Sequence, residues 1–429
     1  MLERLKSLIN DRRGNFAVIA GILMVPVITG IGLAVDYGRA SHAKSTLFGA
    51  ADAAAAGAVS QSSPTYRNGG TFSGSWTKSQ AEADAMALFN ANIVNNVGFK
   101  LEDAHATISQ TGRRIVARVQ YTATVPMTFM RVFGKSEVPI NGEATAVVDT
   151  APYVDFYLLL DNSPSMGLGA TTADIANLEA KTPDKCAFAC HTTQQPSNNY
   201  YEIAKKNGIM MRIDLVRIAA QNLFDKAKEI GVHNEQFRMG TYTFGASAEN
   251  LRLEEVAQMS ADLDKGKKAV GAVDLMTIPS QGYDNDQQTP FDKIFSEITT
   301  KVGMQGDGSG PGSREKIVFF VSDGVADHKK GPCTGIKRAS RCHEPIDPKI
   351  CRTLKDRNIK VAVLYTTYQR VPRNGYYMAN VDPYQPDIGD KMRECASGGL
   401  YFQVSPSEGI VEAMEMLFLK VLGNPRITS

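Results

Sequence analysis

Two uninterrupted apolar runs, each followed by an aspartate, are the feature that most constrains the fold of this 429-residue chain. The first run, residues 156–160, is followed directly by Asp161, and the second, residues 317–321, ends two residues before Asp323. Continuous apolar runs of this length are typical of strands that are buried on both faces of a parallel sheet. Because open parallel sheets bind ligands at the carboxyl ends of their strands, we expect both aspartates at that edge.

Hydroxyl side chains accompany these two aspartates. Ser163 and Ser165 follow Asp161 in the motif D-N-S-P-S, Asp323 lies in S-D-G, and Thr289 lies between them in a Thr-Pro pair. Each motif alone also occurs in turns or at the first residue of a helix, so the prediction depends on their combination. Hydroxyls mixed with carboxylates form an all-oxygen site that suits a small divalent cation, Mg²⁺ or otherwise Mn²⁺ or Ca²⁺.

The order D-x-S-x-S, Thr-Pro and strand-borne S-D-G resembles the metal-ion-dependent adhesion site of von Willebrand factor A domains. The resemblance covers roughly residues 150–423 and implies a doubly wound, mainly parallel, Rossmann-like α/β sheet. It also implies that the two serines bind the metal directly, that the two aspartates bind mainly through water, and that Thr289 binds in either way. One position on the metal would then be left for a carboxylate of a protein partner.

The N-terminal region contains a long stretch without charge. Residues 14–35 carry no charged side chain and are long enough to cross a bilayer as a helix, so we predict a transmembrane helix over residues 14–36. Residues 1–13 form a basic tail, and the larger number of basic residues before the span favours a cytoplasmic N-terminus. A cleaved signal peptide is the alternative, but the stretch is longer than a typical signal h-region and lacks a small-x-small cleavage site before Asp36.

The sequence around the span carries a second resemblance. R-R-G-N-F-A precedes the span, A-V-D-Y ends it, and an alanine-rich run at residues 50–56 follows. Together, over about residues 10–60, these features resemble the N-terminal region of TadG-like proteins of tight-adherence (Flp) pilus assembly. The resemblance implies a single-pass protein of the bacterial inner membrane, with its C-terminal domain in the periplasm or cell envelope and with pilus assembly components as partners. Ile19 stands where processed relatives carry a glutamate, which favours an anchored, unprocessed member.

The rest of the chain divides into two predicted domains. Residues 37–150 are expected to form a helical extension and a small α+β domain, with strands at 106–109, 115–125 and 143–148. Residues 151–429 are expected to form the A domain, with an insertion at about 167–211 and a helix whose apolar face recurs over 213–230.

All six cysteines lie in the second of these domains, and an even number beyond a membrane anchor indicates a disulfide-permissive compartment. Six cysteines allow fifteen pairings. Proximity in sequence favours Cys186–Cys190 and Cys333–Cys342, which leaves Cys351–Cys395. The C-A-F-A-C-H run is one residue longer between its cysteines than a haem attachment motif, and zinc near C-H at 342–343 is a further alternative.

Composition and motifs limit the function. A net charge of +2 and the lack of a dense Lys/Arg patch argue against a nucleic-acid partner. The sequence contains neither G-x-S-x-G nor H-E-x-x-H, so we do not predict an enzyme. The favoured interpretation is an assembly or structural factor for Flp-type pili that binds an acidic residue of an envelope or pilus partner through its metal. The alternative is a surface-exposed adhesin or matrix-binding protein unrelated to pilus assembly.

Overall fold

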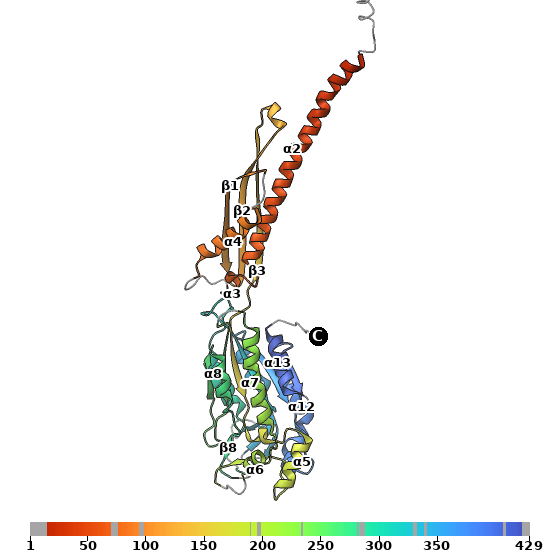
Figure 1. Ribbon diagram of the computed structural model, residues 1–429. Helices are drawn as coiled ribbons and strands as arrows, with labels where there is room; N and C mark the ends of the chain where they lie inside the picture. The colour runs from red at the N-terminus through yellow and green to blue at the C-terminus, as the bar shows by residue number, and fades with distance from the viewer. Residues whose placement is uncertain are drawn as a thin grey trace, which may run out of the picture. The chain divides into compact units, whose positions relative to one another are not determined.

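The computed structural model describes residues 15–69, 76–93, 98–188, 190–194, 199–232, 235–280, 283, 288–328, 333–338, 341–405 and 409–422. The chain forms two compact units, Met1–Ala151 and Pro152–Ser429, each with its own hydrophobic core (Figure 1).

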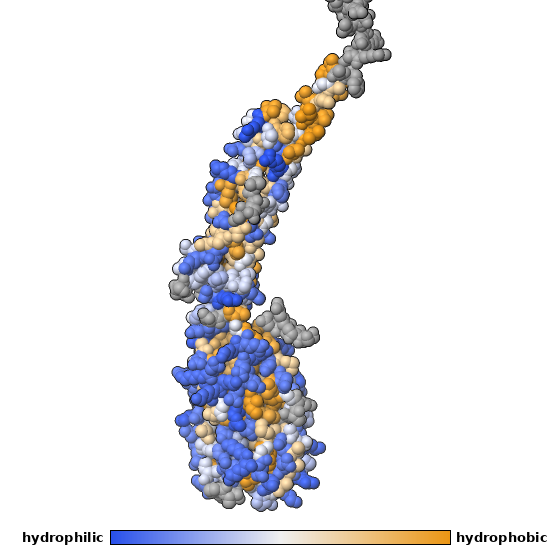
Figure 2. Space-filling model, viewed as in Figure 1, coloured by the Kyte–Doolittle hydropathy of each residue, from blue (hydrophilic) through white to orange (hydrophobic). Residues whose placement is uncertain are grey.

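The first unit begins with a single long helix, α2 (Asn15–Ala58). It is the one helix among the described residues that is long and apolar enough to cross a bilayer. The apolar side chains of its N-terminal part are exposed, for example Ile22 at 67% and Val25 at 66% (Figure 2). The helix continues without interruption beyond the predicted span through the alanine-rich run, as its high helix propensity predicts.

A three-stranded antiparallel sheet in the order β1-β2-β3 packs against the C-terminal half of α2 and against α4 (Lys78–Ile93). All three predicted strand segments lie within observed strands. The core between sheet and helices contains Leu47, Phe89 and Tyr121. The remaining elements of this unit are α3 (Pro64–Arg67), β1 (Lys100–Thr111), β2 (Arg114–Pro126), η2 (Met130–Phe133) and β3 (Glu137–Asp149).

The second unit is built on a six-stranded sheet in the order β14-β13-β9-β4-β6-β7. All neighbouring strands are parallel except the edge pair β6 and β7, so the predicted doubly wound, mainly parallel sheet is confirmed. The strands are β4 (Val154–Leu160), β6 (Phe237–Thr243), β7 (Glu254–Ser260), β9 (Glu315–Ser322), β13 (Lys360–Thr366) and β14 (Tyr401–Val404). Every residue of β4 is buried, as expected for a central strand covered on both faces.

Helices cover both faces of this sheet and create two hydrophobic cores. One core is formed with α7 (Arg212–Ile230), α8 (Leu263–Val270) and α13 (Ile410–Val421) (Figure 1). The other is formed with α9 (Phe291–Val302) and α12 (Gln385–Cys395). The helix predicted from the apolar repeat over 213–230 is therefore confirmed as α7.

Short elements fill the connections between sheet and helices. The predicted insertion carries α5 (Thr172–Lys181), β5 (His191–Thr192) and α6 (Tyr200–Lys206), and a small sheet in the order β10-β12-β11 follows β9. The other short elements are η3 (Pro164–Gly167), β8 (Thr277–Ile278), β10 (Val325–His328), β11 (Ile336–Arg338), β12 (Arg341–Pro345), η5 (Pro348–Cys351), α10 (Arg352–Lys355), α11 (Gly375–Asn380) and η6 (Asp382–Tyr384).

Two of the three favoured cysteine pairings are present, namely Cys333–Cys342 and Cys351–Cys395. The third favoured pairing, Cys186–Cys190, is not among the disulfides seen in the described residues, and the Cys186 sulfur lies 3.4 Å from the carbonyl oxygen of Phe188. Since Cys342 forms a disulfide with Cys333, its sulfur is not available as the thiolate ligand that the zinc alternative would use.

Candidate metal site and its cavity

The two aspartates that end apolar strands lie at the same edge of the six-stranded sheet. Strands β4 and β9 are parallel neighbours in register from Val154 opposite Glu315 to Leu160 opposite Val321. The Asp161 N–H continues this ladder by donating to the carbonyl of Val321 at 2.9 Å. Both strands therefore deliver their carboxylates at their carboxyl ends, as the sequence predicted.

A tight turn after β4 positions the first carboxylate and both serines. Asp161 Oδ1 accepts from the Ser163 N–H at 2.9 Å, and Asp161 Oδ2 accepts from the Ser322 hydroxyl at 2.6 Å. The Oγ atoms of Ser163 and Ser165 lie 3.0 Å apart. The side chains of Asp161 and Ser163 are completely buried, so this turn is fixed in geometry and shielded from water.

The electrostatic environment of Asp161 disfavours its charge. Burial is the main cause and the negative charge of Asp323 is the next, and together they raise the pKa of Asp161 to about 7. The hydrogen bonds from Ser163 and Ser322 act in the opposite direction. A cation beside this carboxylate would remove most of the penalty, because an opposite charge favours the ionised form.

Asp323 has a partner that sequence reasoning did not identify. Arg212, the first residue of α7, is completely buried, and its Nη1 donates to Asp323 Oδ2 at 2.9 Å. Its Nη2 donates to the carbonyl of Thr367 at 3.4 Å, and its guanidinium carbon lies 4.6 Å from the centre of the Tyr368 ring. The sequence signal that could have found it is indirect: two buried carboxylates need a compensating charge, and Arg212 stands at the start of a helix that is otherwise apolar on its buried face.

Tyr368 lies between the turn that carries Ser165 and the carboxylate of Asp323. Its hydroxyl interacts with both Asp323 and Ser165, and burial followed by the charge of Asp323 raises its pKa well above the usual value. The hydroxyl of Tyr368 therefore stays protonated at neutral pH. It serves as a neutral hydrogen-bonding group between the serine turn and the second aspartate.

Thr289, the fifth predicted ligand, lies two residues before α9. Its backbone pairs with Asp327 in an isolated antiparallel bridge, with N–H to carbonyl distances of 3.1 and 3.3 Å. Ser165 and Thr289 both line a cavity of about 270 Å³. The structure thus brings Asp161, Ser163, Ser165 and Asp323 together and places Thr289 on the wall of the adjoining cavity.

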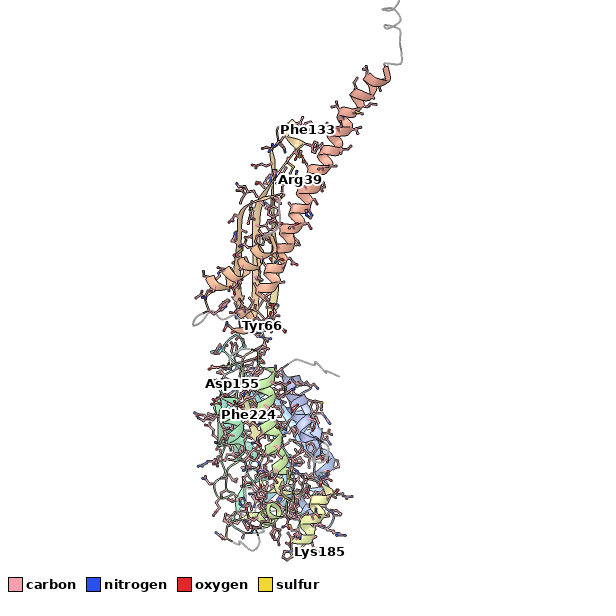
Figure 3. The ribbon with its side chains drawn as sticks, viewed as in Figure 1. Arg39, Tyr66, Phe133, Asp155, Lys185 and Phe224 are labelled. Atoms are coloured by element: carbon pink, nitrogen blue, oxygen red, sulfur yellow. A yellow bond between two sulfur atoms is a disulfide. The ribbon has the colours of Figure 1, made fainter. Side chains whose placement is uncertain are left out.

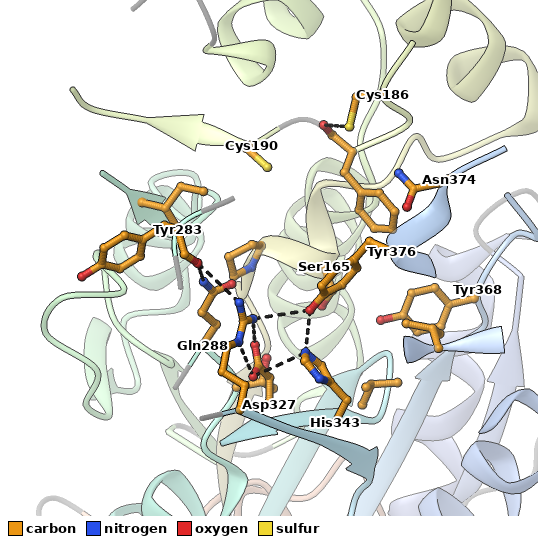
Figure 4. A pocket seen from close by; sticks show the side chains of 17 residues that line it. Ser165, Cys186, Cys190, Tyr283, Gln288, Asp327, His343, Tyr368, Asn374 and Tyr376 are labelled. Atoms are coloured by element: carbon orange, nitrogen blue, oxygen red, sulfur yellow. Dashed lines mark hydrogen bonds and ion pairs between the residues drawn. The ribbon is translucent and has the colours of Figure 1, made fainter. Parts of the chain in front are cut away.

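A buried polar network forms another wall of that cavity (Figure 4). Arg341 makes a two-pronged ion pair with Asp327, with Nε to Oδ1 at 2.9 Å. His343 Nε2 lies 3.6 Å from Asp327 Oδ1 and contacts the hydroxyl of Tyr376. These residues come from β10, β12 and α11, and no motif in the sequence indicated that they would meet.

The donor set fits a small divalent cation. Ligands at right angles around Mg²⁺, with bonds of about 2.1 Å, lie about 3.0 Å from each other, which is the separation of the two serine Oγ atoms. When both carboxylates are ionised, the single guanidinium of Arg212 leaves the site with a net negative charge for a cation to compensate. The site is not purely anionic, because the positive charge of Arg212 already compensates the carboxylate of Asp323.

The first unit contains a segment that matches a known protein family. Residues 14–61 match the family described as "Putative Flp pilus-assembly TadE/G-like". The N-terminal segment is a TadE/G-like domain. This segment contains all of α2, including the predicted span and the alanine-rich extension. No curated protein sequence matches the chain.

Several solved structures are similar to the chain at low identity. The von Willebrand factor domain of the type V pili tip protein Mfa5 from Porphyromonas gingivalis is 10% identical, with a TM-score of 0.37, and the match covers 65% of this chain and 99% of that one. The PilB minor pilin from Streptococcus sanguinis is 12% identical, with a TM-score of 0.34, and the match covers 76% of this chain and 77% of that one.

Proposed function

We propose that this protein is a membrane-anchored, non-enzymatic assembly or structural factor for Flp-type pilus biogenesis. The TadE/G-like domain at residues 14–61 is the observation that carries the proposal. Residues 14–36 would span the bacterial inner membrane with the basic tail in the cytoplasm, and the second unit would lie in the periplasm or cell envelope. The two disulfides of that unit suit such an oxidising compartment.

The second unit would bind its partner through a divalent cation. Ser163 and Ser165 would hold the cation directly, and Asp161, Asp323 and Thr289 would complete the site, in part through water. When bound, the cation supplies an open position for a carboxylate of a pilus or envelope protein. Ser165 belongs both to this site and to the wall of the cavity, so an acidic side chain entering the cavity would reach the cation.

Calorimetric titration of Mg²⁺ into the full chain in detergent tests the metal site. We expect saturable one-to-one binding that Asp161→Asn abolishes, because the substitution keeps the shape of the turn and removes the charge. Asp390→Asn, at a carboxylate that is 77% exposed, is the matched control and should bind as the parent does. Equal binding by the parent and Asp161→Asn would contradict the proposed site.

Capture of envelope proteins by the full chain, with and without EDTA, tests the partner. We expect pilus assembly components to be retained only when the divalent cation is present and only by a chain with Asp161 intact. Capture of matrix or host-surface proteins instead would favour the alternative function of an exposed adhesin.

A further inference from the structure

The connection between β2 and β3 presents an apolar surface. Within residues 128–135, here called the hairpin tip, Val132 is 84% exposed, Phe133 is 60% exposed and Phe129 is 40% exposed. Arg131 and Lys135 in the same segment are also exposed. Figure 3 shows Phe133 at the end of the hairpin, beside α2. Exposing large apolar side chains to water is unfavourable in free energy. An apolar surface of this kind indicates a site of interaction with a membrane or a protein.

Asp36 of α2 binds the backbone of the hairpin tip. Its side chain has no exposed surface and accepts three backbone hydrogen bonds, from Thr128 at 3.0 Å and from Phe129 and Met130 at 2.8 Å each. Arg39, one turn further along α2, donates to the Thr128 hydroxyl at 3.0 Å. The position of the hairpin tip along α2 is therefore fixed by charge-assisted hydrogen bonds.

Gly32 brings the tip still closer to the membrane-spanning part of α2. A Cβ atom at this glycine would lie 2.5 Å from Cγ of Phe129, so the aromatic ring packs directly on the helix backbone. Gly32 precedes Asp36 by four residues, which is about 6 Å along a helix. The ring of Phe129 therefore packs beside the uncharged stretch of α2, residues 14–35, and not beyond its C-terminal end.

The exposed side chains of α2 on either side of Gly32 are also apolar. Ile31 is 61% exposed and Val35 is 46% exposed. If residues 14–36 span a bilayer, these side chains face lipid, and the hairpin tip beside them lies in the same layer. The surfaces of helix and tip are continuous, which favours a lipid environment over a separate protein for both.

We propose that the hairpin tip enters the interfacial layer of the bilayer, in the leaflet that faces the periplasm, as a second membrane contact. Elements that lie in this layer bury their apolar side chains at the boundary between headgroups and acyl chains, so Phe133 and Val132 would lie there. Arg131 and Lys135 would extend to the lipid phosphates. This inference depends on the proposed membrane anchor. A second contact would fix the rotation of the first unit about α2, which a single helix leaves free.

Single-tryptophan reporters in liposomes test the depth of the tip. Trp76 is the only tryptophan of the chain, so Trp76→Phe provides a silent background. Three reporters are compared in that background: F133W at the tip, V25W in the middle of the predicted span and T107W on the exposed face of β1. Each full-length variant is reconstituted with phosphatidylcholine or phosphatidylglycerol whose acyl chains carry bromine either near the headgroup or near the chain end.

We expect F133W to emit at shorter wavelength than T107W and to lose fluorescence with bromine near the headgroup. V25W should lose fluorescence most with bromine near the chain end, and T107W should not respond. Quenching of V25W without quenching of F133W would overturn the hairpin proposal while leaving the anchor intact. A blue-shifted F133W that brominated lipid does not quench would indicate a protein contact and would overturn it as well.

Failure of V25W to respond would contradict the anchor itself and, with it, this inference. Should Trp76→Phe fail to fold, the difference in quenching between F133W in the parent sequence and the parent alone supplies the same measurement. A parent chain and an F133W chain with equal quenching would then count against the proposal.

Discussion

In the second unit, Arg212 Nη1 lies 2.9 Å from Asp323 Oδ2, and neither side chain has any exposed surface. A fully buried pair of this kind is held in place because each charge would be costly without the other. It joins the first turn of α7 to the end of β9 directly beside the candidate metal site.

Replacing Arg212 by Met should lower the free energy of unfolding of the second unit by about 3 to 5 kcal/mol in EDTA, because the substitution leaves Asp323 buried and uncompensated. Mg²⁺ should then restore more stability to Arg212→Met than it adds to the parent, since the cation meets two uncompensated carboxylates. Urea unfolding with Mg²⁺ and with EDTA measures both effects. Arg393→Met, which breaks an exposed pair, should cost no more than about 1 kcal/mol. Equal Mg²⁺ effects in parent and Arg212→Met would contradict a cation beside Asp323.

The raised pKa of Asp161 predicts a pH dependence of the metal-free protein. A carboxyl whose pKa is higher in the folded than in the unfolded state stabilises the fold below the unfolded pKa, and that contribution is lost as pH rises through about 7. From pH 5 to pH 8 in EDTA, this group should reduce the free energy of unfolding by about 2 to 3 kcal/mol. Asp161→Asn should lack that component when urea unfolding is followed at both pH values.

Asp390→Asn serves as the control for this pH series and should retain the dependence of the parent. Mg²⁺ binding competes with the proton on Asp161, so its affinity should increase between pH 6 and pH 8. A parent and an Asp161→Asn variant with the same pH profile would show that Asp161 titrates normally.

The two disulfides should differ in their contribution to stability. Cys351–Cys395 joins residues 44 apart, whereas Cys333–Cys342 joins residues nine apart, so the first constrains the unfolded chain more. The loop-closure relation gives about 4 kcal/mol for the longer loop and about 3 kcal/mol for the shorter one. Paired substitution of each cystine by alanines, followed by thermal unfolding, should give the larger loss for residues 351 and 395. The reverse order would mean that packing around the sulfurs outweighs chain entropy.

Asp36→Ala should loosen the hairpin tip, because three backbone N–H groups of residues 128–130 lose their common acceptor. Hydrogen exchange of those amides in detergent should become faster, while exchange in the middle of β2 changes little. Asp52→Ala, at an exposed carboxylate of the same helix, is the matched control and should leave the tip protected. Unchanged exchange at Thr128 in Asp36→Ala would show that Gly32 and Arg39 suffice to hold the tip.

The main architecture could be predicted from local properties of the sequence. Continuous apolar runs predicted the buried strands β4 and β9, and the parallel arrangement that such strands adopt placed Asp161 and Asp323 at one edge of the sheet. The uncharged stretch of residues 14–35 and the alanine-rich run likewise predicted the helix α2. These properties are local, since each segment carries in its own composition the information on burial and chain direction that the prediction needs.

The partners of the buried charges, in contrast, depend on how distant segments pack together. Arg212 meets Asp323 across 111 residues of sequence, and Asp36 meets Thr128 across 92. The position of Thr289 on the cavity wall was likewise set by its pairing with Asp327. Composition and periodicity specify that a segment is buried but not which distant segment covers it, because many partners satisfy the same pattern. A buried charge is compensated by whichever opposite charge or hydrogen-bond donor the packing of sheets and helices brings within about 3 Å, and that choice is made by the fold as a whole.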